Sequence, residues 1–141
     1  MNKVFLDTSV VVTFFDKGDP LHDESKRMLL DISRKKIRLI STDYVLDECI
    51  TTILAKIGHK IAVESVELIL NSNLISMIWL DEPMLMKAWE YFKKHSDKGY
   101  SFTDCTSFVL MKEMKIDRCL SFDRHFEQAG FKNFCKSLNS D

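Results

Sequence analysis

The chain opens with Val4-Phe5-Leu6-Asp7-Thr8-Ser9, and a related arrangement returns near its end as Leu120-Ser121-Phe122-Asp123. In each stretch a short apolar run is followed directly by acidic and hydroxyl side chains. Parallel strands end at the same edge of a sheet, so we expect Asp7 and Asp123 to lie close together there. Hard divalent cations prefer several oxygen ligands in one small space. The sequence therefore predicts a cation site at the carboxyl edge of a parallel sheet.

The composition is that of one ordinary globular domain spanning residues 1–141. The apolar fraction is 45% and the charged fraction 29%, values that argue against disorder. The net charge of −1 weakens a prediction of nucleic-acid binding without excluding it, because nucleic-acid binders are more often basic. A carboxylate cluster would itself subtract several charges, and bound metal would restore some of them.

The apolar run before Asp7 is too short for a signal-peptide core or a membrane span, so we expect a cytoplasmic protein with no membrane association. The four cysteines form no CxxC pair, which argues against a zinc knuckle or a thioredoxin motif. Reduced, buried thiols are expected for all of them, namely Cys49, Cys105, Cys119 and Cys135.

Strands and helices alternate along the chain. Strands are predicted at Lys3–Leu6, Ile37–Ile40, Ile75–Leu80 and Arg118–Ser121, with a weak fifth near Asn133–Cys135. Helices are predicted at about Pro20–Lys35, Asp43–Ile57, Lys60–Asn71, Glu82–His95, Thr103–Met114 and Arg124–Gln128. This alternation predicts right-handed crossovers and a parallel sheet with helices on both faces.

Two adjacent acids, Asp47 and Glu48, follow the second predicted strand. On a helical wheel Glu48 points roughly 160° from the apolar stripe and Asp47 roughly 100°. Glu48 thus faces either solvent or a cleft over the strand ends, and the wheel alone favours solvent. The wheel does not decide cleanly which of the two acids would face such a cleft.

A further acid lies at the start of a predicted helix. Ser101 stands three residues before Asp104, which is the spacing of a capping box with Asp in place of the usual Glu. Taken alone, this favours a simple helix-starting role for Asp104, stabilised by the helix dipole. The following helix is apolar on most sides, however, so its first turn is also well placed to reach the strand ends.

With these four acids in order, the chain resembles a PIN domain, and within that family the VapC-type toxin ribonucleases. The resemblance runs from Lys3 to about Phe134. Its matching segments are Phe5–Ser9, Tyr44–Glu48, Ser101–Cys105, Leu120–Phe126 and Gly130–Phe131.

The resemblance implies a three-layer α/β/α fold with a central parallel sheet of strand order 3-2-1-4-5. It also implies a ribonuclease that hydrolyses RNA phosphodiester bonds with Mg²⁺ or Mn²⁺. Asp7 and Asp104 correspond to metal ligands, and Glu48 and Asp123 to acids that act directly or through water. The family pattern favours Glu48 over Asp47. Supporting hydroxyls are implied at Thr8, Ser9 and Ser121.

The same resemblance implies a toxin of a type II toxin–antitoxin pair, with a small antitoxin partner and a homodimeric assembly. One alternative is a stand-alone PIN-domain nuclease that processes RNA. Others are a non-catalytic PIN module that binds RNA or protein, and an aspartyl-phosphate phosphatase. The phosphatase would need an acid two residues after Asp7, where this chain has Ser9.

Several other side chains are given structural roles. His125 and Arg124 are expected at an exposed helix start rather than at the site, although contact with a phosphate is the alternative. Trp89 and Phe92 are expected in the core because they are three residues apart on one predicted helix.

Overall fold

The computed structural model describes residues 2–134. Its centre is a five-stranded, all-parallel sheet of order β3-β2-β1-β4-β5. The strands are β1 (Lys3–Leu6), β2 (Arg38–Thr42), β3 (Ile75–Ile78), β4 (Arg118–Leu120) and β5 (Lys132–Asn133). The predicted strand order is confirmed. Of the weak fifth strand, Cys135 lies outside the described residues.

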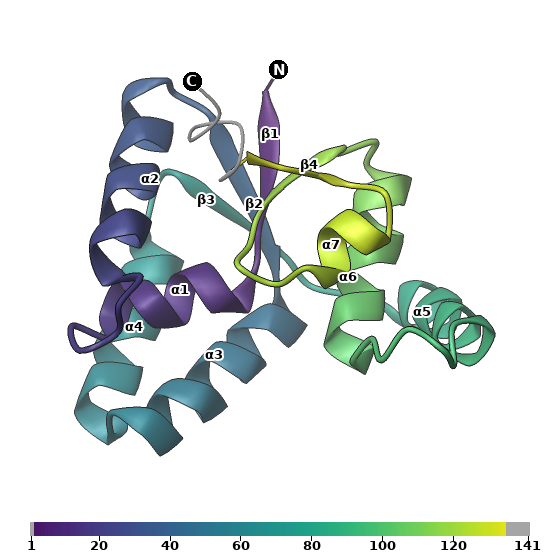
Figure 1. Ribbon diagram of the computed structural model, residues 1–141, viewed down its shortest axis with the longest axis horizontal. Coiled ribbons are helices and arrows are strands. Elements are labelled where there is room, and N and C mark those ends of the chain that lie inside the picture. The colour runs from purple at the N-terminus through teal and green to yellow at the C-terminus, as the bar shows by residue number, and fades with distance from the viewer. Residues whose placement is uncertain (1, 135–141) are drawn as a thin grey trace.

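Helices lie on both sides of the sheet, which confirms the three-layer α/β/α architecture. Figure 1 shows α1, α2 and α4 on one side of β1, and α5, α6 and α7 on the other. The helices are α1 (Thr8–Phe15), α2 (His22–Arg34), α3 (Asp43–Lys56), α4 (His59–Asn71), α5 (Glu82–Lys94), α6 (Phe102–Glu113) and α7 (His125–Gln128). Within residues 2–134, none of them is long and apolar enough to cross a bilayer.

The central strands are buried on both faces, as a parallel sheet between two helical layers requires. Val4, Phe5 and Leu6 of β1 are at most 2% exposed. On one face the ring of Phe5 packs against Phe126 of α7, which in turn meets Phe108 of α6 edge to face. This packing fixes α6 and α7 against the strands whose ends carry the acids.

No helix was predicted at Thr8–Phe15, where the structure has α1, so the prediction was wrong for this segment. It follows β1 without a loop, so Thr8 and Ser9 lie in its first turn and Asp7 is its N-cap. Its sequence holds three consecutive valines, Val10–Val12, and β-branched residues have weak helix propensity. Burial of these valines between the sheet and neighbouring helices overrides that propensity.

Placing Trp89 and Phe92 in the core was also wrong. Trp89 is 44% exposed and Phe92 39% exposed, and their rings stack on each other at 5.8 Å. The inward face of α5 is instead formed by Ala88, which is fully buried, and Tyr91, whose ring meets Phe108. The predicted core face was therefore rotated by one residue around the helix.

Candidate active site

Strands β1 and β4 end side by side, and this places Asp7 next to Ser121. Leu6 pairs with Leu120, and the backbone amide of Asp7 donates to the carbonyl of Leu120 at 3.1 Å. The next residue of each strand then leaves the sheet at the same edge. The prediction that the two acidic segments meet rested on parallel strands that end at one edge, and β1 and β4 do pair in parallel.

Asp7 is 5% exposed, and two hydroxyls hold its carboxylate. Ser9 Oγ donates to Oδ2 at 2.9 Å and Ser121 Oγ donates to the same oxygen at 2.7 Å. Burial, together with the nearby charge of Asp104, raises the pKa of Asp7 from 3.8 to about 6 against the lowering effect of the two serines. A bound cation would favour the ionised form of this carboxyl group.

The two serines also shape the loop that follows β4. Ser9 Oγ accepts the backbone amide of Phe122 at 2.9 Å, and Ser121 Oγ accepts that of Asp123 at 2.9 Å. Asn133 of β5 donates to the carbonyl of Ser121 at 2.6 Å. Asn133 was not predicted as part of this network, and no motif in the sequence marks it. Ser9, Ser121 and Asn133 thus fix the position of the Asp123 backbone.

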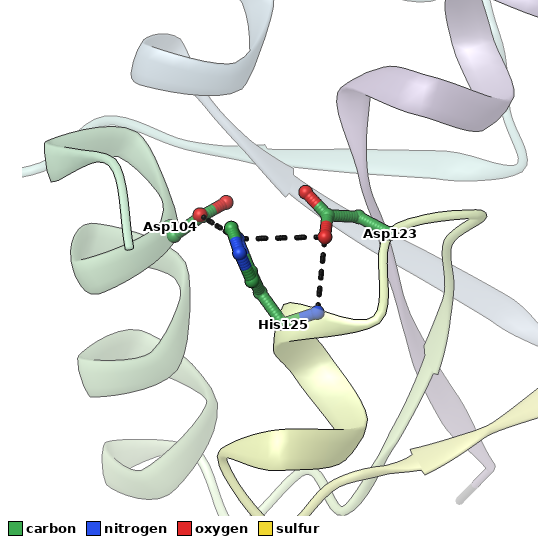
Figure 2. Close-up of side chains that lie close together, drawn as sticks. All are labelled: Asp104, Asp123 and His125. Atoms are coloured by element: carbon green, nitrogen blue, oxygen red, sulfur yellow. Dashed lines mark hydrogen bonds and ion pairs between the residues drawn. The ribbon is translucent and has the colours of Figure 1, made fainter. Parts of the chain in front are cut away.

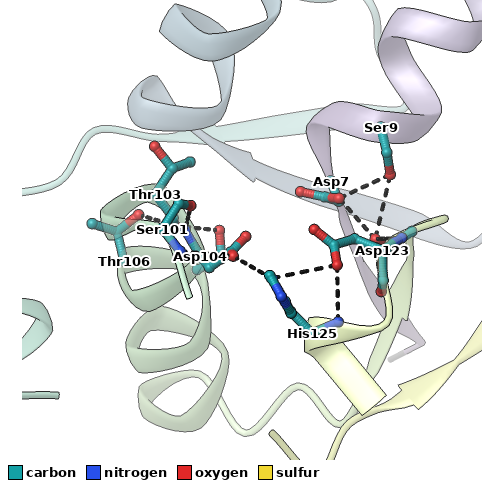
Figure 3. Close-up of polar contacts among 10 residues, drawn as sticks. Asp7, Ser9, Ser101, Thr103, Asp104, Thr106, Asp123 and His125 are labelled. Carbon is teal, nitrogen blue, oxygen red and sulfur yellow. Dashed lines mark hydrogen bonds and ion pairs between the residues drawn. The ribbon is translucent and has the colours of Figure 1, made fainter. Parts of the chain in front are cut away.

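Asp104 lies in the first turn of α6, where it both caps the helix and reaches the cleft at the strand ends. Its Oδ2 accepts the backbone amide of Ser101 at 3.0 Å, and Ser101 Oγ accepts the amide of Asp104 at 3.0 Å, which completes a capping box. The side chain also faces the other acids, as Figure 3 shows. Asp104 is only 8% exposed, so the cap holds a nearly buried carboxylate in place.

Asp123 approaches Asp104 from the loop after β4, and His125 lies between them (Figure 2). His125 Nδ1 is 2.9 Å from Asp104 Oδ2 and 3.4 Å from Asp123 Oδ1. Its side chain is 28% exposed, so the expected exposed helix start was wrong for this residue. The approach of α6 to α7 causes the difference, because it brings Asp104 against a ring that would otherwise face solvent.

Glu48 lines the same cleft from α3, whereas Asp47 is exposed and does not line it. The N-terminus of α3 is fixed by Thr42, whose Oγ1 accepts the amide of Val45 at 3.1 Å. Of the two adjacent acids, Glu48 is therefore the one that faces the cleft, which agrees with the family pattern.

The four predicted acids line one open cleft of about 370 Å³ at the carboxyl edge of the sheet. Asp7, Asp104 and Asp123 come from three separate elements and meet through the contacts above. Thr8 and Ser9 also line this cleft, and Ser121 is fully buried beneath it. Three ionisable side chains that also line the cleft were not predicted as site residues, namely Asp19, Lys56 and His125.

The donor set suits a hard divalent cation, because the acids offer oxygen atoms that the protein does not use. Within the described part of the chain, the hydrogen bonds to Asp104 end on Oδ2, and those to Asp123 end on Oδ1. The other oxygen of each carboxylate remains available. Thr8 Oγ1 is buried and has no hydrogen-bond partner among residues 2–134. An oxygen-ligated cation with its waters would satisfy such groups.

The three cysteines in the described part of the chain do not line the cleft. Cys49, Cys105 and Cys119 are buried and free, as predicted, and Cys135 lies outside the described residues. Burial raises the pKa of Cys105 to about 11, and the charge of Asp104 adds to the effect. In the metal-free protein such a thiol stays protonated at neutral pH and is a poor nucleophile.

An α/β/α fold with acids gathered at the carboxyl edge of a 3-2-1-4-5 sheet defines a class of metal-dependent nucleases. The PIN domain family matches residues 4–132, so this chain belongs to the PIN-domain family. PIN nucleases generally use divalent metal ions, in agreement with the acidic cluster.

The relatives are VapC ribonucleases. The chain is 30% identical over 128 residues to the 23S rRNA-specific endonuclease VapC20 of Mycobacterium tuberculosis, covering 91% of this chain and 95% of that protein. It is 30% identical over 137 residues to a VapC ribonuclease of Archaeoglobus fulgidus, covering 95% of this chain and 86% of that protein.

Solved structures show the same fold. The crystal structure of Mycobacterium tuberculosis VapC20, a Sarcin-Ricin loop cleaving toxin, superposes with a TM-score of 0.82 over 91% of this chain and 95% of that one, at 30% identity. The Rickettsia felis VapBC2 structure, solved with promoter DNA, matches with a TM-score of 0.69 at 13% identity over 93% of this chain and 96% of that one. The second match supports the fold alone.

Proposed function

We propose that this chain is a single-domain, Mg²⁺- or Mn²⁺-dependent endoribonuclease and the toxin of a type II toxin–antitoxin pair. The observation that carries the proposal is the meeting of Asp7, Asp104 and Asp123 in one cleft, with Glu48 lining it. The family membership supports the same chemistry. VapC20 is a Sarcin-Ricin loop cleaving toxin, and the Archaeoglobus fulgidus relative is a VapC ribonuclease.

In this proposal Asp7 and Asp104 hold the cation, and Glu48 and Asp123 hold it directly or through water. A divalent cation at this site would lower the pKa of bound water and stabilise charge on the phosphoryl oxygens. The protein's own contribution is orientation. Ser9 and Ser121 keep one oxygen of Asp7 engaged, the capping box keeps Asp104 at the first turn of α6, and the buried hydroxyl of Thr8 supports a water or ligand oxygen.

The proposed substrate is structured RNA, and 23S rRNA is the first to test because VapC20 is specific for it. The cleft also offers one group suited to the phosphate backbone. Glu48, Thr52 and Lys56 line it at four-residue spacing along one face of α3. Among the described residues that line the cleft, Lys56 carries the one primary amine. Phosphate contacts from such cations supply much of the affinity for RNA.

The proposed partners are a small antitoxin and a second copy of the chain, acting in the cytoplasm. Exposed apolar side chains offer surfaces for both contacts. On α3, α4 and the turn between them they are Leu54, Ile57, Val63, Leu68 and Leu70, and around α5 they are Trp79, Met86, Trp89 and Phe92. Sedimentation of the purified chain, alone and with the product of an adjacent short reading frame, tests both partners.

The central test is cleavage of ribosomal RNA by purified, antitoxin-free protein with Mn²⁺ or Mg²⁺, beside EDTA and an Asp104→Asn variant. The asparagine oxygen still accepts from the Ser101 amide, so the helix cap and the fold are retained. Discrete cuts that disappear with EDTA and in the variant support the proposal. Cuts that persist in Asp104→Asn identify a contaminating nuclease, and such cuts would not support the proposal. Absence of cutting by folded wild-type protein on all RNAs would favour a non-catalytic PIN module.

A further inference from the structure

The imidazole of His125 connects two acids that come from different elements. Its Nδ1 lies 2.9 Å from Asp104 Oδ2 on α6 and 3.4 Å from Asp123 Oδ1 in the loop after β4 (Figure 2). A carboxylate oxygen accepts hydrogen bonds, so the Nδ1–H tautomer is assigned to His125 from this contact. The ring therefore donates to Asp104 Oδ2 and lies close to Asp123 Oδ1, at the place where α6 approaches α7.

The ring is held in this position from three directions. The backbone amide of His125 donates to Asp123 Oδ1 at 3.0 Å. The next residue, Phe126, is fully buried between Phe5 and Phe108, which anchors the start of α7. Tyr100, itself 6% exposed, lies edge to face against the imidazole at 5.3 Å. An exposed residue at a helix start would not need such supports.

These contacts use one oxygen of each acid. Asp104 Oδ2 receives the Ser101 amide and His125 Nδ1, and Asp123 Oδ1 receives the His125 amide. Each carboxylate is thereby turned so that its other oxygen remains available in the cleft. Hydrogen bonds of this kind orient the carboxylates that bind metals, and their loss weakens metal binding.

We propose that His125 is a positioning residue that sets the relative placement of Asp104 and Asp123 for a divalent cation through its Nδ1–H group. The proposal rests on the proposed metal-dependent function of the same cleft. The proposed role depends on the N–H group at Nδ1, so another side chain with an N–H group at that place should substitute for histidine. If His125 only filled space, the Mn²⁺ affinity of the variants would instead depend on the volume of the side chain.

The test compares Mn²⁺ binding by titration calorimetry in His125→Asn, His125→Gln and His125→Ala. The amide nitrogen of asparagine falls near the position of Nδ1, whereas that of glutamine falls near Nε2. We expect His125→Ala to weaken Mn²⁺ binding by about 10–100-fold, as for other groups that orient metal ligands. His125→Asn should recover most of that loss and His125→Gln little of it.

Two controls separate positioning from folding. His59 is exposed on α4 and lines a different groove, so His59→Asn should bind Mn²⁺ as the wild type does. Thermal unfolding with EDTA should show that all variants are folded. In RNA cleavage, His125→Ala should regain rate at raised Mn²⁺ with the KM for RNA unchanged.

Two results would overturn the proposal. One is wild-type Mn²⁺ affinity in folded His125→Ala, and the other is His125→Asn binding no better than His125→Ala. Wild-type protein that binds Mn²⁺ but cuts no RNA would contradict the proposed nuclease function, while the calorimetry would still decide the role of His125. Wild-type protein that binds no Mn²⁺ at millimolar concentration would overturn both.

Discussion

Ser121 donates a 2.7 Å hydrogen bond to Asp7 from 114 positions away in the sequence. The same hydroxyl accepts the backbone amide of Asp123 at 2.9 Å, so one serine connects two acids of the cluster. The bond exists because β1 and β4 are neighbours in the sheet, with Leu6 opposite Leu120. Ser121 is thus as much a part of the cleft's geometry as the acids themselves.

Replacement of Ser121 by alanine should weaken both stability and metal binding. Ser121 is fully buried, and Ser121→Ala leaves the Asp123 amide without its acceptor and removes a donor from Asp7. The free energy of unfolding, measured by urea denaturation, should fall by about 1–3 kcal/mol. Ser33→Ala, at an exposed position of α2, should stay within about 0.5 kcal/mol of the wild type. Equal stability of the two variants would contradict the role given to Ser121.

Asp7 should make the metal-free protein less stable as the pH rises. Burial and the charge of Asp104 raise its pKa to about 6 in the folded state, from 3.8 in the unfolded chain. The folded state therefore binds more protons between these two values, and stability falls as the pH rises through that window. A shift of about two units corresponds to at most about 3 kcal/mol of destabilisation once the pH exceeds the folded pKa.

The variant Asp7→Asn tests this, because it removes the titration and keeps an oxygen for the two serines. Denaturation with EDTA should show Asp7→Asn more stable than the wild type near pH 7.5. The difference should shrink as the pH falls from about 6 to about 4. Added Mn²⁺ should stabilise the wild type more than the variant. A stability difference that does not change with pH would show that Asp7 is not the titrating group.

Local patterns in the sequence predicted the alternation of strands and helices and marked Asp7, Asp104 and Asp123, whereas the strand order 3-2-1-4-5 was implied by the family resemblance. Apolar runs ending in Asp7 and Asp123 mark strand ends, and Ser101 and Asp104 mark a helix start. Glu48 was assigned over Asp47 by the family pattern, since the helical wheel left the pair open. Its place in the cleft depends on how α3 crosses the sheet edge, which no local pattern encodes.

What the sequence did not show depends on contacts between distant elements. Helix α1 forms from valines of weak helix propensity because tertiary packing buries them. His125 becomes part of the site only because α6 brings Asp104 against α7. Trp89 and Phe92 were placed in the core by spacing alone, and only the docking of α5 on α6 shows that the neighbouring face, through Ala88, is the buried one.

The adjacent acids Asp47 and Glu48 offer a matched pair for testing the cleft. Glu48→Gln should reduce RNA cleavage by about 10–100-fold at limiting Mn²⁺, because it removes a carboxylate that lines the site. Asp47→Asn makes the same chemical change one residue away, at an exposed position outside the cleft, and should leave the rate near that of the wild type. The reverse pattern in a single-turnover assay would show that Asp47 is the functional acid.

Lys56 should contribute to RNA affinity rather than to the chemical step. It lies at the last residue of α3, two turns beyond Glu48 on the face that lines the cleft. A lysine at a helix C-terminus also suits the helix dipole, which is a purely structural explanation. A phosphate contact instead makes the affinity for RNA fall as the salt concentration rises. In a plot of log affinity against log salt, each phosphate neutralised on a single strand contributes about 0.7 to the slope.

The test is RNA binding by catalytically disabled Asp104→Asn protein, with and without Lys56→Ala, over a range of salt concentrations. Lys56→Ala should weaken binding and lower the salt slope by about 0.7. Lys26→Ala, at an exposed position of α2 outside the cleft, removes the same charge and should leave the slope unchanged. If both lysine variants lower the slope equally, binding responds to net charge alone. A changed slope for Lys56→Ala only would place an RNA phosphate at the α3 end of the cleft.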